Sequence, residues 1–303
     1  MPAIAILGPG GVGGLVAAML VRAGSDVVVI GREPEVDVIR RDGISVESVA
    51  FGAFSARPAA RTELTTPAAV LLVATKAPSL AQALERIQAQ PELVVPLMNG
   101  LEHMTLLRSR FGATAVAAGA IRMEADRPEP GHVIQSSPAV RIELATDHPG
   151  LEPRLAQLAD VLDAAGITTQ IGTSEAQVLW SKLVRLNALA ATTSAADVPM
   201  GAIREDPDWR ATLVACVQET AAVANASGAT IDPAASLAEL DAVHPMQRSS
   251  MQRDIAAGRE PELDAILGAV IRAAVRHGLE CPATARLATA IAARAGVPAP
   301  QIQ

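Results

Sequence analysis

Residues 3–13 read AIAILGPGGVG, a short apolar run that leads directly into a cluster of glycines. Leu15, Met19 and Leu20 follow at helical spacing, and residues 27–30, VVVI, form a second apolar run of β-branched character. The pattern predicts a strand, a tight turn, a helix and a second strand within about 30 residues, the length of a βαβ unit. Strands joined by such a crossover lie parallel, so the sequence predicts a parallel sheet.

The glycines after the first strand have the spacing of a dinucleotide-binding turn. Gly8 would allow the tight turn, Gly10 would let the backbone approach a pyrophosphate, and Gly13 would let helix and strand pack closely. Gly11 and Val12 lie at the start of the helix, where backbone N–H groups face a bound anion. Because the motif lies between a predicted strand and a predicted helix, it indicates a dinucleotide-binding domain of the Rossmann type.

The residues after the second strand favour NADPH as the dinucleotide. An enzyme specific for NAD places an acidic side chain there, whereas one specific for NADP places a basic side chain near the 2′-phosphate. Here Ile30 is followed by Gly31 and Arg32, and a guanidinium suits a phosphate dianion. The neighbouring Glu33 is acidic and, in contrast, favours NAD.

Two patterns divide the chain. Apolar runs at 70–74, 93–98 and 115–121 alternate with amphipathic stretches after Pro78 and Leu101, and shorter alternating runs and a helix at 151–165 follow. After Gly172, where Thr173 or Ser174 could cap a long helix, nearly everything has helical period, with breaks at prolines. We therefore predict an α/β fold, with a parallel-sheet NADP-binding domain over residues 1–172 and an all-helical substrate-binding domain over residues 173–303.

Composition excludes several classes of partner. The chain has 303 residues, 50% of them apolar, a net charge of -7 and no run of Lys and Arg, which argues against nucleic acid and anionic membranes. No apolar stretch is long enough to span a bilayer, and the N-terminus lacks the features of a signal peptide. The five histidines and the distant Cys216 and Cys281 have no metal-ligand spacing. These features predict a cytoplasmic enzyme with a small-molecule substrate and no metal, and an apolar face of the C-terminal helices would suit a homodimer.

Lysine and tyrosine usage narrows the chemistry. The chain has no tyrosine, which excludes reductases that use a tyrosine as the acid, and its only lysines are Lys76 and Lys182. Lys76 and Asn99 each follow a predicted buried strand, at the sheet edge where ligands bind. Lys182 lies among apolar residues of the long helix, and Glu262 is its candidate partner. A lysine protonated at neutral pH can give a proton and a positive field to the alkoxide formed when a ketone is reduced.

In combination, these motifs resemble the ketopantoate reductase (2-dehydropantoate 2-reductase) family. The resemblance runs in order along almost the whole chain. Besides the glycine motif, the matching segments are Thr75-Lys76, Asn99-Gly100, residues 180–183 (WSKL), residues 249–251 (SSM) with Asp254, residues 262–264 (ELD), and His277-Gly278 with Pro282. The resemblance implies reduction of ketopantoate to pantoate with NADPH, in a protein with an N-terminal Rossmann domain and a helical C-terminal domain.

The resemblance also implies a role for each site residue. Lys182 would be the acid at the substrate carbonyl, in a cleft between the domains. Glu262 would bind the substrate hydroxyl and hold the lysine, Asn99 would orient substrate and nicotinamide, and Ser250 would touch the substrate carboxylate. Two residues would serve the cofactor, Arg32 at the 2′-phosphate and Lys76.

One departure concerns the substrate. Many family members have asparagines one and two helical turns after the lysine, where this chain has Leu186 and Ala190. Asn187, one position away, is rotated by about 100° on a helix and is the remaining candidate for a substrate contact. A more apolar pocket would suit a different ketone or 2-oxo acid.

Two further alternatives remain. A β-hydroxyacid dehydrogenase or imine reductase also pairs a Rossmann domain with helices, but the spacing of Lys182 and Asn187 does not match the one-turn spacing of those families. A non-catalytic NADP-binding sensor would need no acid, and Lys182 in a nearly lysine-free chain argues against it.

Overall fold

The computed structural model describes residues 4–301, which form two compact units. The first unit consists of the described residues through Met98 together with His103–Val178. The second consists of Asn99–Glu102 and the described residues from Leu179 onward. The boundary predicted from the sequence, between residues 172 and 173, lies shortly before the point where the structure passes from the first unit to the second, between Val178 and Leu179. The short segment Asn99–Glu102, which the sequence assigned to the first domain, belongs to the second unit.

The first unit is built on a five-stranded parallel sheet. Its order is β5 (Ala59–Arg61), β2 (Val27–Ile30), β1 (Ile4–Leu7), β6 (Val70–Val73) and β7 (Leu93–Pro96). The predicted α/β class with a parallel sheet is confirmed; Ala3, the predicted first residue of β1, lies outside the described residues. Leu7 is in register with Ile30 on one side and Val73 on the other, so β1, β2 and β6 end at one edge.

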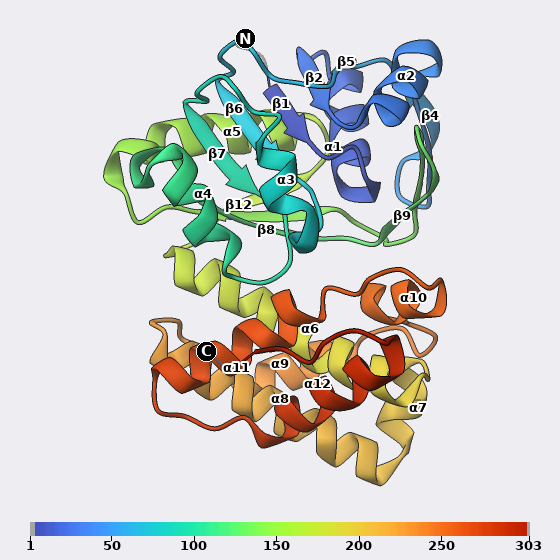
Figure 1. Cartoon of the computed structure of the whole chain (residues 1–303), viewed down its shortest axis with the longest axis vertical. Coiled ribbons are helices and arrows are strands. Elements are labelled where there is room, and N and C mark those ends of the chain that lie inside the picture. Colours follow the sequence, from blue (N-terminus) through green and yellow to red (C-terminus); the bar gives the residue numbers. More distant parts are fainter. Residues whose placement is uncertain (1–3, 302–303) are drawn as a thin grey trace. The chain divides into compact units, whose positions relative to one another are not determined.

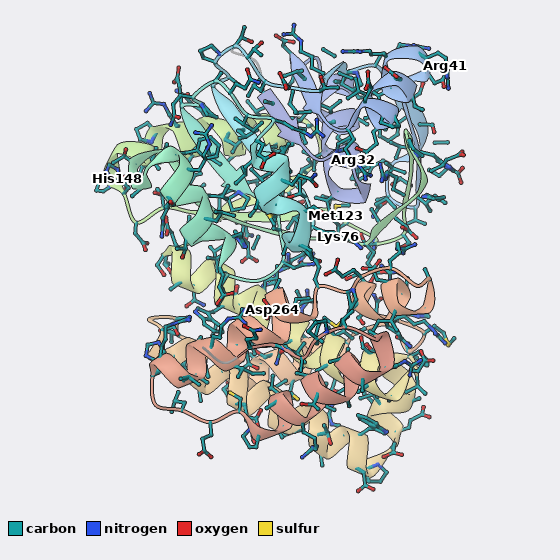
Figure 2. All side chains as sticks on the ribbon, viewed as in Figure 1. Arg32, Arg41, Lys76, Met123, His148 and Asp264 are labelled. Atoms are coloured by element: carbon teal, nitrogen blue, oxygen red, sulfur yellow. The ribbon has the colours of Figure 1, made fainter. Side chains whose placement is uncertain are left out.

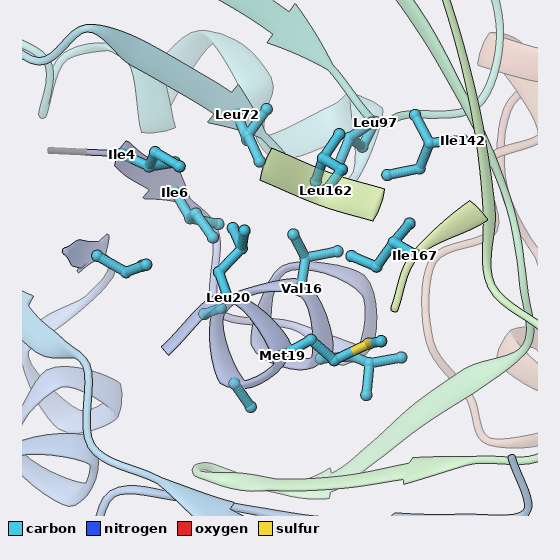
Figure 3. Packing of buried hydrophobic residues seen from close by; sticks show 14 of the residues in the cluster. Ile4, Ile6, Val16, Met19, Leu20, Leu72, Leu97, Ile142, Leu162 and Ile167 are labelled. Atoms are coloured by element: carbon cyan, nitrogen blue, oxygen red, sulfur yellow. The ribbon is translucent and has the colours of Figure 1, made fainter. Parts of the chain in front are cut away.

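Helix α1 (Gly11–Arg22) provides the centre of the core of this unit. Val16 and Leu20 are fully buried in one cluster with Ile6 of β1 and Leu162 of α5 (Glu152–Ala164), as Figure 3 shows. The core is made almost wholly of aliphatic side chains, in keeping with the low aromatic content. The other helical segments of the unit are α2 (Glu33–Asp42), η1 (Ala77–Ser79), α3 (Leu80–Leu84), α4 (His103–Phe111), η2 (Ala113–Ala115) and η3 (Pro149–Leu151).

Two smaller sheets complete the first unit. One has the order β4 (Gly52–Ala56), β3 (Ile44–Ser48), β10 (His132–Gln135), β9 (Ala125–Glu129), and the other β12 (Thr168–Ile171), β11 (Arg141–Ala145), β8 (Ala118–Arg122). Strands β4, β5, β9 and β12 were not predicted, because most of their side chains are exposed; β3, in which Ile44 and Val46 are buried, was not predicted either. Strand β9 matters for function, since it lies against the start of α1: a Cβ on Gly11 would be 3.0 Å from the carbonyl oxygen of Ala125.

The second unit is helical, as predicted (Figure 1). The helices are interrupted near prolines, as the sequence predicted. The Asp206 and Asp232 side chains cap the helices that begin at the prolines that follow them. The elements are α6 (Glu175–Ala196), whose first turn belongs to the first unit, then α7 (Met200–Glu205), α8 (Pro207–Ala226), α9 (Pro233–Asp241), α10 (Ser250–Ala256), the π-helical turn η4 (Asp264–Gly268), α11 (Ala269–Arg276) and α12 (Pro282–Ala295). Among the described residues, no helix combines the length and apolar character needed to cross a membrane.

Candidate active site

The turn after β1 has the conformation that its glycines predict. Gly8 has a φ of +93°, and a Cβ there would lie 2.8 Å from the Thr75 side chain, which follows β6. A Cβ on Gly13 would lie 2.1 Å from the carbonyl oxygen of Gly8. Side chains at either position would therefore force the start of α1 away from the ends of β1 and β6.

Gly10 differs from these two positions, because the space that its Cβ would occupy is open. Nothing lies within 4 Å of that point. Gly10 is also the N-cap of α1, where no side chain caps the helix and the first turn has no acidic residue. The uncapped helix start and the open space beside it form a cradle that fits the pyrophosphate of a dinucleotide.

Arg32, the predicted ligand of a 2′-phosphate, is the N-cap residue of α2 and lies two residues after the end of β2. Its side chain is 69% exposed, and its Nη2 donates to Glu35 Oε1 at 2.8 Å. The same oxygen accepts a hydrogen bond from Arg127 Nη1 of β9 at 2.7 Å. Arg127 Nη1 is also 3.5 Å from the carbonyl oxygen of Pro9 in the glycine turn. The Glu35 carboxylate thus joins the start of α2 to β9, and Arg127 in turn contacts the glycine turn.

The charge state of this cluster follows from its contacts. Burial of Glu35 opposes ionisation, but hydrogen bonds from Arg32 and Arg127 outweigh it and lower the pKa of Glu35 to about 2. The hydrogen bond between Arg32 and Glu35 and the negative charge of Glu35 raise the pKa of Arg32. At neutral pH the cluster therefore holds two cations and one anion, and the exposed guanidinium remains attractive to a phosphate.

Lys76 is exposed and immediately follows Thr75, the residue that abuts Gly8. It is the N-cap of the short turn η1, at the edge of the sheet where β6 ends. Figure 2 labels Lys76 and Arg32, both on the first unit. The position is compatible with the predicted contact between Lys76 and the cofactor.

Asn99 and Glu262, predicted as site residues from distant parts of the sequence, meet in the second unit. Asn99 Nδ2 donates to Glu262 Oε2 at 2.8 Å. Glu262 is only 8% exposed and precedes the π-helical turn η4. A buried carboxylate that accepts from an amide is held in one orientation, so the pair can present fixed polar atoms to a substrate.

Lys182 is half-buried on α6, in the same unit as Asn99 and Glu262. Ala190, two turns further along, is fully buried, and Leu186 is half-buried. The helix continues unbroken through these residues, so Asn187 is not rotated onto the position of Leu186.

Asn187 is part of the helix packing instead of an open site. It is completely buried, and its Nδ2 donates to Thr220 Oγ1 at 2.8 Å and lies 3.4 Å from Thr284 Oγ1. Its Oδ1 is buried and accepts no hydrogen bond from the described residues. We therefore leave Asn187 out of the proposed substrate site.

The two serines at the start of α10, Ser249 and Ser250, have different environments. Ser249 is buried, and its Oγ accepts a hydrogen bond from the backbone N–H of Gln252, which caps the helix. Ser250 is exposed in the first turn of α10, so its hydroxyl is not used for capping. The position leaves Ser250 accessible to a ligand.

Sequence reasoning missed three charged residues that hold the site residues in place. These are Glu35 and Arg127 beside Arg32, and Arg272, which binds Glu102 next to Asn99. Glu35 had a local signal, since an acidic side chain at this position of a helix can accept a hydrogen bond from the backbone N–H of the N-cap residue, as Glu35 Oε2 does from Arg32 at 3.1 Å. Glu35 lies 92 residues from Arg127, and Glu102 lies 170 residues from Arg272, so no local pattern could reveal these two pairs.

Comparison with known proteins identifies the family of this chain. The family model described as Ketopantoate reductase PanE/ApbA matches residues 4–146, and the model of its C-terminal part matches residues 176–295. A 2-dehydropantoate 2-reductase of Mycobacterium tuberculosis is 31% identical, over 97% of this chain and 98% of that protein. The solved structure of a PanE/ApbA family ketopantoate reductase from Ralstonia eutropha has a TM-score of 0.86 at 26% identity, covering 97% of this chain and 98% of that one. A ternary structure of D-mandelate dehydrogenase with NADH and anilino(oxo)acetate has a TM-score of 0.89 at 22% identity, covering 97% and 98% of the two chains, which shows a shared fold.

Proposed function

Since the chain belongs to the ketopantoate reductase family, whose members are NADP-dependent oxidoreductases, we propose that it reduces 2-dehydropantoate to pantoate with NADPH. The proposal combines the dinucleotide cradle of the first unit with the polar group of Asn99, Glu262 and Lys182 in the second. Each half has residues suited to one reactant.

On the cofactor side, the open space at Gly10 and the uncapped start of α1 would hold the pyrophosphate. Arg32 would bind the 2′-phosphate, and Lys76 would add a second cation at the same sheet edge. When bound, NADPH supplies the hydride that adds to the carbonyl carbon of the substrate.

On the substrate side, Lys182 would act as the general acid. The carbonyl oxygen gains negative charge as the ketone is reduced, and the Lys182 ammonium would donate its proton to that oxygen to give the alcohol. Glu262 would accept a hydrogen bond from a substrate hydroxyl, and Asn99 would orient the substrate. Ser250 would donate its exposed hydroxyl to the substrate carboxylate.

The hydrogen bond between Asn99 and Glu262 is the observation that carries the proposal. These residues are 163 positions apart, yet their side chains meet at 2.8 Å with the carboxylate buried. If Asn99 belonged only to an ordinary surface turn and Glu262 only to a solvated helix start, their side chains would not form this hydrogen bond.

The test is the oxidation of NADPH by the purified protein, followed by absorbance, with 2-dehydropantoate and a panel of other 2-oxo acids. Lys182→Ala should lower kcat by about 100-fold or more, the contribution usual for a general acid. Arg185→Ala is the matched control, because it removes a cation from the same helix that is paired with Glu239. If both variants lose the same activity, or if Lys182→Ala keeps it, the assignment of the acid is wrong.

A second candidate is reduction of a different 2-oxo acid by the same chemistry. It is favoured by Leu186 and Ala190, which offer no hydrogen bonds at positions where many family members carry asparagine. Faster turnover of an acid with an apolar side chain than of 2-dehydropantoate would replace the first proposal with the second. Binding of NADPH without turnover of any acid in the panel would refute both.

A further inference from the structure

We propose that Arg272 is a positioning residue for the reaction, because it fixes the segment that carries Asn99 to the helical unit through Glu102. The inference rests on the proposed function, which assigns Asn99 and Glu262 to the substrate. It adds a residue that contacts neither substrate nor cofactor and acts through the backbone next to Asn99.

Arg272 donates two parallel hydrogen bonds to the carboxylate of Glu102. Its Nε donates to Oε1 at 2.8 Å and its Nη2 to Oε2 at 2.6 Å. This fork geometry fixes both the distance and the orientation of the carboxylate. Glu102 ends the short segment Asn99–Glu102, so the contact anchors one end of the segment while Asn99 binds Glu262 at the other.

The other donors of Arg272 bind the turn that follows Glu262. Nη1 donates to Asp264 Oδ1 at 2.7 Å, and Nη2 lies 3.0 Å from Oδ2 and 3.2 Å from the Asp264 carbonyl oxygen. Nη1 also donates to the carbonyl oxygen of Gln301 at 3.0 Å. One guanidinium therefore connects the Asn99 segment with the residues directly after Glu262; Figure 2 marks Asp264 on this turn.

The backbone of the segment is fitted to the same turn. Gly100 has a φ of +88°, and a Cβ there would lie 2.2 Å from the carbonyl oxygen of Ala265. The turn η4 is π-helical, a wider geometry that is often found at functional sites. Gly100 and Arg272 thus hold the segment against residues 264–265 from two directions.

Arg272 is suited to this role by its burial and charge. Its side chain is 13% exposed, and the hydrogen bond that it donates to Glu102, with the further contact to Asp264, raises the pKa of Arg272 above its usual range. Its ionisable neighbours are Glu102, Asp264 and the more exposed Arg276, whose Nη1 lies 4.0 Å from Glu102. A lysine has a single ammonium and could not occupy all these acceptors at once.

The first test measures whether Arg272 and Asn99 act together. Arg272→Met should lower kcat/KM by about 10-fold, since a displacement of a reactive group by 1 Å can cost up to about 100-fold. In an Asn99→Ala background the same substitution should change kcat/KM by less than about 2-fold, because the group to be positioned is already absent. Arg286→Met is the matched control, because it makes the same substitution at an exposed arginine of α12 in the same unit, and it should leave kcat/KM unchanged.

Equal losses with and without Asn99 would overturn the proposal, because a general structural defect does not depend on Asn99. Arg272→Lys keeps the charge and restores one contact, so it should recover part of kcat/KM and confirm that a folded protein is being measured.

The second test needs no turnover and separates this inference from the proposed function. Hydrogen exchange of the cofactor-free protein should become faster in the peptide that contains residues 99–102 on Arg272→Met, and stay unchanged in α4 that follows. Unchanged exchange in residues 99–102 would refute the anchoring role even in an active enzyme. Faster exchange in a protein that reduces no 2-oxo acid would confirm the anchoring and refute the proposed function.

Discussion

Alanine at Gly100 and alanine at Gly112 form a matched pair of perturbations. Both glycines have a φ of +88°, a value that other residues rarely adopt, so a Cβ strains the backbone at each. The space around them differs: a Cβ on Gly100 would lie 2.2 Å from the Ala265 carbonyl oxygen, whereas nothing lies within 4 Å of a Cβ on Gly112. The pair therefore separates the cost of the conformation from the cost of the close approach.

The expected magnitudes follow from these two terms. Alanine at a positive φ costs at least about 1 kcal/mol, and both variants should lose this amount. At Gly100 the Ala265 carbonyl must also retreat by about 1 Å, and overpacking of this kind adds about 2 kcal/mol. At about 2 °C per kcal/mol, Gly112→Ala should lower the apparent Tm by about 2 °C and Gly100→Ala by about 6 °C.

Thermal unfolding and steady-state kinetics check both terms. Gly100→Ala should also lower kcat/KM, because it pushes the Asn99 segment away from Glu262, while Gly112→Ala should leave kcat/KM near that of the parent. Equal Tm and equal kcat/KM for the two variants would show that the segment does not depend on close contact with residue 265.

Two other predictions concern buried ionisable groups. Glu35→Gln should destabilise the protein by about 2 kcal/mol at pH 7, because the pKa of Glu35 is lowered from 4.5 to about 2 and solvent screening reduces the full linkage value. This stability is present above pH 4.5 and is lost as the pH falls toward 2, so the Tm of parent and variant should converge there; a difference that persists at pH 2 would contradict the assignment. Burial raises the pKa of Cys216 and of Cys281 to about 12, so neither thiol should react with an aromatic disulfide reagent at pH 7, and both should react after denaturation. Rapid reaction of the native protein would show that these side chains reach solvent.

The sequence predicted the parts of the fold that have strong local signals. The βαβ unit and its glycine turn were predicted because strand, turn and helix each leave a distinct pattern within 30 residues. Helix breaks were predicted at the prolines, including Pro207 and Pro233, and the aspartate before each of these two prolines caps the helix that begins there. Residues 44–48, ISVES, alternate in the manner of a strand, and this available signal for β3 was not used.

The candidate site was predictable to a different degree. Asn99 and Glu262 were identified from strand-end position and family resemblance, and the structure brings them together. The supporting residues Arg127 and Arg272 were not identified, because an arginine on a strand or helix has the same local pattern whether it faces solvent or a distant carboxylate. For Asn187 the prediction failed in the opposite way: its polar side chain suggested a ligand contact, but it is buried in the helix packing, where its Nδ2 donates to Thr220.

The assignment of residues 99–102 to the helical unit has a consequence for chimeric enzymes. The gene encodes Asn99 within the nucleotide-binding half, but the side chain and backbone that hold it are encoded more than 150 codons later. A hybrid that joins two relatives at a single crossover in α6 would combine the Asn99 segment of one parent with the π-helical turn of the other. Substrate preference could be exchanged between such enzymes only if this four-residue segment travels with the helices that receive it. Such an exchange therefore needs three crossovers, one before residue 99, one after residue 102 and one in α6, to keep the proposed substrate site intact.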